Sequence, residues 1–131
     1  MENRIRSDYT KSLQDLQDGL LILGSMVEKA IHKSMQSLKE RDLQLAQTVI
    51  AEDDLIDQKR FELENTAVTL LATQSPMAAD LRLIISALHI AVELERMGDY
   101  AEGIAKISSR IGGEALLKPL IDIPRIGDLA S

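Results

Sequence analysis

A long stretch without helix-breaking residues constrains this chain more than any other feature of its sequence. No glycine occurs between Ser25 and Met97, and Pro76 is the only proline in that stretch. Glycine and proline are the residues that most disfavour the interior of a helix. The stretch is therefore predicted to form long helices, with an interruption at Pro76.

The composition agrees with a helical fold built around an aliphatic core. Of the 131 residues, 45% are apolar, but there are only two Tyr, one Phe and no Trp. Aromatic and β-branched residues are the ones that favour strands, and this scarcity of aromatics disfavours an aromatic-cored sandwich or barrel. The length is typical of one domain that can bury its own core.

Apolar residues recur every three or four positions in three segments, as on the buried side of an amphipathic helix. The first stripe, in a helix over about residues 5–38, contains Ile5, Tyr9, Leu13, Leu16, Leu20, Leu23, Val27, Ala30, Ser34 and Leu38. The second contains Leu45/Ala46, Val49, Asp53, Ile56, Arg60, Leu63, Ala67 and Leu70/Leu71. The third contains Leu81, Ile84/Ile85, Leu88, Val92, Glu95, Asp99, Glu102 and Lys106.

The ends of the second and third helices have recognisable signals. Asp42 is a suitable N-cap for a helix that continues to about Thr73. Ser75-Pro76 combines an N-cap residue with proline at the first helical position, and this third helix is expected to end near Arg110, before Gly112-Gly113.

Three long helices with short connections must run up, down and up. We therefore expect an all-α, antiparallel up-down-up three-helix bundle over residues 1–111. Residues 112–131 contain Pro119, Pro124 and an apolar pattern that begins and then stops. We expect this part to be a linker and the start of a further helix, truncated in a fragment of a longer protein.

Two glycines fall inside the first predicted helix, at Gly19 and Gly24. Each costs about 1 kcal/mol relative to alanine in a helix interior. Two explanations are open: a neighbouring element approaches closely at these positions, or the helix is locally weak.

Charge and the lack of targeting signals exclude several classes of protein. The net charge is −6 and the pI is about 4.9, which disfavours a nucleic-acid binder because such proteins need a basic face. The longest apolar run, over residues 83–92, is too short to cross a membrane. The absence of cysteine and of a signal peptide leads us to expect a cytoplasmic protein without membrane insertion.

Two pairs of acids interrupt the apolar stripes: Asp53/Asp57 on the second helix and Glu95/Asp99 on the third. Residues four apart lie on the same face of a helix. We compared the distance of each pair from the turn at residues 74–75 along its own helix. With a rise of ~1.5 Å per residue, the two pairs lie at the same distance from the turn to within roughly 5 Å. We therefore expect all four carboxylates to converge at one level of the bundle.

Carboxylates gathered in a partly dry place must bind a cation, pair with a basic side chain, or take up protons. An all-oxygen ligand set suits Mg²⁺, Mn²⁺ or iron. In a plainer alternative, Arg60 and Arg96 neutralise the acids in a purely structural bundle. The predicted metal ligands are Asp53, Asp57, Glu95 and Asp99, and the candidates for the outer shell are Glu52, Asp54 and Glu102.

Three segments carry a resemblance to a known family. They are residues 49–57 (VIAEDDLID), 74–82 (QSPMAADLR) and 93–99 (ELERMGD). Together they resemble the PhoU family of phosphate-signalling proteins, and the resemblance covers about residues 5–125.

The resemblance implies an all-α protein, usually with two tandem three-helix bundles, whose Glu/Asp-x-x-x-Asp motifs bind clusters of iron, zinc or other metals. By position, those motifs are Asp53-x-x-x-Asp57 and Glu95-x-x-x-Asp99 in this chain. This chain departs from the pattern because it holds one repeat rather than two.

The resemblance also implies an adaptor, and not an enzyme, at the inner face of the membrane. Family members repress the phosphate-starvation response by linking a phosphate ABC transporter to a sensor histidine kinase. We therefore expect a metal-binding negative regulator of phosphate uptake that forms a homodimer or another homo-oligomer. The alternative is a carboxylate-bridged metalloenzyme in a helical bundle.

Overall fold

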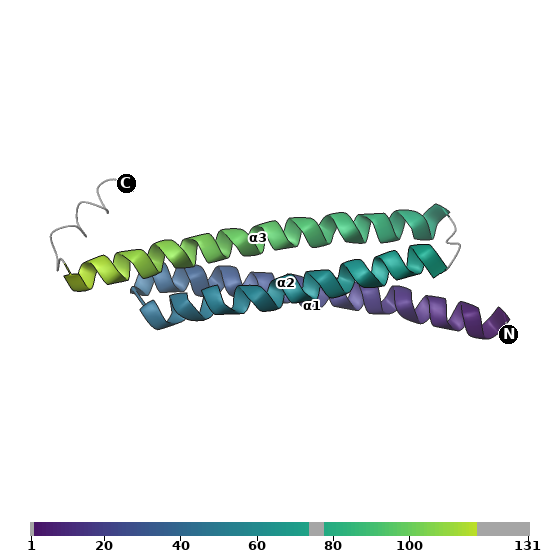
Figure 1. The fold of residues 1–131 in the computed structure, drawn as a ribbon, viewed down its shortest axis with the longest axis horizontal. Helices are drawn as coiled ribbons and strands as arrows, with labels where there is room; N and C mark the ends of the chain where they lie inside the picture. Colours follow the sequence, from purple (N-terminus) through teal and green to yellow (C-terminus); the bar gives the residue numbers. More distant parts are fainter. Residues whose placement is uncertain (1, 74–77, 118–131) are drawn as a thin grey trace.

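The computed structural model describes residues 2–73 and 78–117, which form three helices. Helix α1 is Glu2–Glu40, α2 is Leu43–Thr73 and α3 is Ala78–Leu117. The helices lie side by side and alternate in direction, and each packs against the other two (Figure 1). The predicted fold class, an all-α antiparallel three-helix bundle, is confirmed. Within these residue ranges, no helix combines the length and the apolar character needed to cross a membrane.

The turn between α1 and α2 follows from its local sequence. Arg41 adopts a left-handed conformation with φ of 54°. The N–H of Asp42 then donates to the carbonyl of Ser37 at 2.9 Å, which closes the end of α1 as in a Schellman motif. Asp42 Oδ1 accepts from the N–H of Leu45 at 3.0 Å and so caps α2, as predicted. The predicted helix start at Ser75-Pro76 lies outside the described residues.

The stripes predicted for the first two helices are buried or partly buried, with one exception among the side chains that the structure describes; Ile5 lies outside them. Leu38 is exposed and Ser37 is buried in its place. Polar Ser37 is tolerated there because its hydroxyl donates to the carbonyl of Ser34 at 2.7 Å. The residues buried in the main cluster from α1 and α2 are Leu16, Leu23, Val27, Ala30, Ile56, Leu63, Ala67 and Leu70.

The stripe predicted for α3 is right at Ile84 and partly right at Leu88, but most of its other members lie about one position from the buried line. Leu81, Val92, Asp99 and Lys106 are exposed. The buried line consists of small residues with one isoleucine: Ile84, Ala87, Ala91, Gly98, Ala101, Ala105 and Ser108. The prediction followed the large apolar residues of α3, most of which lie on its exposed side. The small side chains on the buried side allow the other helices to approach α3 closely.

Helix α3 also continues beyond the predicted end near Arg110. It runs through the two glycines at 112 and 113 to Leu117, so the predicted boundary at residue 111 lies inside a helix. Gly112 faces Leu43 of α2, whose Cδ1 lies 3.7 Å from the position a Cβ would take. The low helix propensity of the two glycines does not end α3 here. The further helix predicted within residues 112–131 falls mostly outside the described residues.

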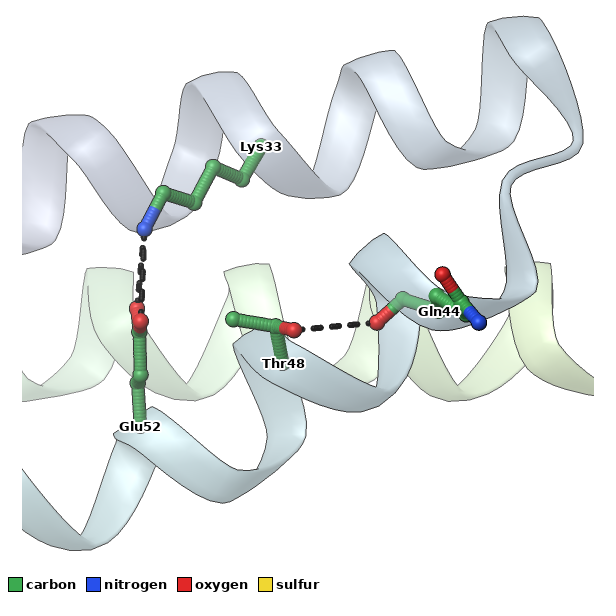
Figure 2. A network of polar contacts seen from close by, with 4 residues as sticks. All are labelled: Lys33, Gln44, Thr48 and Glu52. Carbon is green, nitrogen blue, oxygen red and sulfur yellow. Dashed lines mark hydrogen bonds and ion pairs between the residues drawn. The ribbon is translucent and has the colours of Figure 1, made fainter.

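A polar contact joins α1 to α2 near their turn. Lys33 Nζ of α1 lies 3.1 Å from Glu52 Oε2 of α2 (Figure 2). On α2 itself, the hydroxyl of Thr48 donates to the backbone carbonyl of Gln44 at 3.0 Å. Both ion-pair partners are partly exposed, so the pair contributes at most about 1 kcal/mol to stability.

The two glycines of α1 should respond in opposite ways to alanine. A Cβ at Gly19 would overlap Cδ2 of the buried Leu63, whereas a Cβ at Gly24 would meet nothing within 4 Å. We expect Gly24→Ala to raise the free energy of unfolding by up to about 1 kcal/mol, through helix propensity alone. Gly19→Ala is expected to lower it by about 1 kcal/mol, because overpacking outweighs that gain.

Urea denaturation of both variants measures this difference. Equal stabilisation by the two substitutions would show that α1 does not approach α2 closely at Gly19.

Candidate metal centre

The seam between α2 and α3 is narrow at its centre. Gly98 of α3 is buried against Ile56 of α2, whose Cγ2 lies 3.4 Å from the position of a Cβ at residue 98. Ala101 and Ala105 continue the seam and are fully buried. Because the helices come close together, the short side chain of an aspartate on one helix can meet an aspartate on the other.

Three aspartates meet at this seam. One carboxylate oxygen from each of Asp53, Asp57 and Asp99 lies within 4.8 Å of the other two. Asp53 is 8% exposed, Asp57 is half-buried and Asp99 is exposed. The group is therefore closed by the core on one side and open to solvent on the other.

The buried side of the group contains oxygen atoms without partners. Oδ1 of Asp53 and Oδ1 of Asp57 are shielded from solvent and accept no hydrogen bond from any described residue. None of the three aspartates forms an ion pair with Lys or Arg in the part of the chain that the structure describes. Leaving such oxygens without partners is costly, and a bound cation would satisfy them.

Burial and mutual repulsion raise the pKa values of these acids. Desolvation and the neighbouring Glu102, Asp57 and Asp99 raise the pKa of Asp53 to about 7. The pKa of Asp57 is also raised, mainly by burial and then by the charge of Asp99, although Arg60 acts in the opposite direction. Both shifts mean that the negative charges are poorly compensated by the protein itself.

The fourth predicted ligand, Glu95, lies at the same seam but is engaged elsewhere. Its Oε2 contacts Nε of Arg60 in an ion pair between α3 and α2. Arg60 is held further by Glu64, whose Oε1 lies 2.6 Å from its Nη1, and by Phe61, whose ring centroid lies 4.3 Å from its Cζ. The structure thus brings together three of the four predicted ligands and pairs the fourth with a base. Their role as ligands stays a prediction.

The candidates for the outer shell differ in position. Glu52 pairs with Lys33 of α1, and Asp54 is exposed. Glu102 is half-buried, lies 2.7 Å from Nζ of Lys106, and contributes to the raised pKa of Asp53. Arg96, suggested as a counter-ion, is exposed and pairs with Glu93 at 3.3 Å.

Sequence reasoning missed the close packing at Gly98 that lets these acids meet. The signal was present, because small residues recur at 87, 91, 98, 101 and 105, with steps of three, four or seven positions that keep them on one face of the helix. The prediction did not use this spacing of small residues, because alanine and glycine carry less weight than leucine or valine in a search for apolar periodicity.

Comparison with known proteins agrees with the fold and with the family resemblance. The family model for the PhoU domain matches residues 20–108, more than half of the chain. A "Phosphate-specific transport system accessory protein PhoU homolog" from Clostridium acetobutylicum is 41% identical over 110 residues, covering 83% of this chain and 50% of that protein. A homologue of the same name from Aquifex aeolicus is 34% identical, covering 86% of this chain and 51% of that protein.

A solved structure shows the same arrangement of helices. The crystal structure of PhoU from Pseudomonas aeruginosa is 36% identical and matches 81% of this chain with a TM-score of 0.78. The match covers 51% of that chain. The chain thus spans about half the length of the relatives that it matches, and on this evidence it belongs to the PhoU family.

Proposed function

We propose that this chain is part of a metal-binding cytoplasmic regulator of phosphate uptake. Relatives in its family are named accessory proteins of the phosphate-specific transport system. We infer an adaptor that represses the phosphate-starvation response by contacting components of a phosphate ABC transporter and a sensor histidine kinase. It would stay in the cytoplasm and reach the inner face of the membrane through these partners.

The observation that carries the metal-binding part of the proposal is the buried Asp53. Its unpartnered Oδ1 belongs to a carboxylate grouped with those of Asp57 and Asp99. A cation here would join α2 to α3 and offset much of the negative charge of the three carboxylates. Hard or borderline ions such as Mg²⁺, Mn²⁺, iron or zinc suit oxygen ligands.

The three carboxylates that could bind a metal favour an adaptor over the alternative, a carboxylate-bridged metalloenzyme. Di-iron and di-manganese bundles of that kind also use histidine from Glu-x-x-His motifs. Within the described residues, the group of acids that could hold a metal contains no histidine. The metal, when bound, would supply positive charge and a link between two helices, and the regulator would act through its helix faces.

Metal analysis tests the proposed centre. Protein purified without chelator is expected to retain metal, and the Asp53→Ala/Asp99→Ala variant is expected to lose it, because two of the three grouped carboxylates are gone. The matched control is Glu62→Ala/Glu93→Ala, which removes two exposed acids from the same helices outside the proposed site. Equal metal content in all three proteins would contradict the proposed ligands.

The signalling role needs a test in cells. A bacterium that lacks its own PhoU protein is supplied with this chain and carries a reporter for the phosphate-starvation response. Repression of the reporter at high phosphate is expected, and unchanged reporter activity would contradict the adaptor role.

The outer face of α3 is a candidate surface for the predicted homodimer. Ile85, Val92, Tyr100 and Ile107 are exposed there, and they recur at spacings that place them on one side of the helix. Exposed apolar stripes of this kind mark interaction sites on protein surfaces. We propose that two copies pack through this face.

Charged substitutions test the proposed dimer. Val92→Glu/Ile107→Glu is expected to give a monomer in light scattering coupled to size-exclusion chromatography, because the charges would be buried between copies. Val68→Glu, at an exposed apolar residue of α2, is the control and should not change the mass. A dimer that survives the double substitution would exclude this face.

A further inference from the structure

We propose that two copies of this chain pair through antiparallel α3 helices, with Tyr100 of each copy seated over Gly103 of the other. This arrangement rests on the dimer proposed above. It adds the relative direction of the two helices and the residues that meet at the two-fold axis.

The outer side of α3 carries a hollow of about 360 Å³. The residues that line it all belong to α3, so the hollow opens away from α1 and α2 (Figure 1). Tyr100 at its edge is 72% exposed and Ile107 is 52% exposed. The full lining consists of Arg96, Asp99, Tyr100, Gly103, Ile104 and Ile107.

The hollow exists because residue 103 has no side chain. A Cβ at Gly103 would meet nothing within 4 Å, whereas a Cβ at Gly98 would lie 3.4 Å from Cγ2 of Ile56. Glycine is unfavourable inside a helix, and the packing of this chain on itself does not require it at residue 103. A glycine there does allow a second molecule to approach the helix closely.

The shape of the hollow fits a second copy of the same helix. A two-fold interface is formed by the same patch on both copies, so the patch must be complementary to itself. The six lining residues have the same spacing when read in either direction along α3. A two-fold axis through their midpoint places Tyr100 of one copy over Gly103 of the other, so a large exposed ring fills the gap left by a missing side chain.

The charges beside the hollow favour the antiparallel direction. Glu93 and Arg110 are exposed and lie at equal distances along the helix from the midpoint of Tyr100 and Gly103. Antiparallel helices therefore place Glu93 of one copy opposite Arg110 of the other, twice in each dimer. Parallel helices would place Glu93 beside Glu93 and Arg96 beside Arg96, and like charges at an interface repel.

Exchanging the two charges tests the direction of the helices. Glu93→Arg and Arg110→Glu are each expected to weaken association by about 10-fold at low ionic strength, because each places like charges together at two symmetric points. The double variant Glu93→Arg/Arg110→Glu should associate about as tightly as the unaltered protein. Sedimentation equilibrium measures the dissociation constant of the dimer.

Filling the hollow tests the contact at the axis. Gly103→Gln is expected to weaken association by at least about 10-fold, because the added side chain occupies the place of Tyr100 from the second copy. Gly24→Gln is the matched control on α1, where a Cβ also meets nothing within 4 Å. Both substitutions replace glycine by a better helix former, so both variants should fold.

The outcomes separate this arrangement from the dimer itself. If the unaltered protein is a monomer, both are overturned. If Val92→Glu/Ile107→Glu dissociates the dimer but the double charge exchange does not restore association, only the antiparallel arrangement is overturned. Association of Gly103→Gln as tight as that of Gly24→Gln would exclude the seating of Tyr100 over Gly103.

Discussion

Mn²⁺ is expected to stabilise protein that a chelator has stripped of metal more at about pH 8 than at about pH 5, because metal and protons compete for the same carboxylates. The pKa of Asp53 is raised to about 7 in the folded chain, mainly by burial. The folded protein therefore keeps a proton that the unfolded chain loses near pH 4. Stability from this group is present at low pH and is lost as the pH rises through about 7.

The expected size of the metal effect follows from mass action. Free Mn²⁺ at about 100 times its dissociation constant adds about 3 kcal/mol to the free energy of unfolding. Thermal denaturation at the two pH values, with and without Mn²⁺, measures the effect. A melting temperature that is independent of Mn²⁺ at about pH 8 would contradict the metal centre.

Asp53→Asn is the matched variant, because it keeps the shape of the side chain and removes its charge. Without metal at about pH 8 it should be more stable than the unaltered protein, since the ionised carboxylate no longer has to be buried. It should also lose most of the response to Mn²⁺. A variant that is less stable at high pH and still responds to Mn²⁺ would exclude Asp53 as a ligand.

Ala101→Leu is expected to lower the free energy of unfolding by about 3 kcal/mol, near the top of the range for overpacking. Ala101 is fully buried in the main core, on the face of α3 that the other helices approach. A larger side chain would push α3 away from its neighbours and separate the aspartates that meet across the seam. The variant should therefore also bind Mn²⁺ more weakly.

The control is the same substitution near the start of the same helix. Ala79 is exposed, so Ala79→Leu should change stability by less than about 0.5 kcal/mol. Urea denaturation of both variants makes the comparison. Similar losses at the two positions would mean that the small residues of α3 do not face the core.

Much of the fold could be predicted because it depends on local spacing. The buried stripes of α1 and α2 were predicted nearly residue by residue, and Asp42 caps α2 as expected. Helix periodicity and capping involve residues a few positions apart, so the sequence shows them directly. The three aspartates were found in the same way, from spacing within each helix and matched depth between helices.

The errors lie where one helix meets another. The rotation of α3 about its axis was wrong because its core face is made of alanine and glycine, which signal close packing rather than hydrophobicity. Its end was placed too early because glycine was taken as a helix stop, whereas α3 continues through Gly112 and Gly113 to Leu117. The packing of α3 against the other helices is not visible from the spacing of residues within α3.

The sequence by itself determined that this chain is all-α, that its helices alternate in direction, and that acids on two of them lie at one depth. Only the tertiary structure decided which face of α3 packs against the other helices and which of the four acids lies outside the group of three aspartates. Helix α3 is oriented about its own axis so that its small residues face α2. In this orientation the carboxylates of Asp53, Asp57 and Asp99 lie close together. It also places Glu95 against Arg60, because an ion pair between helices depends on their distance and rotation rather than on periodicity.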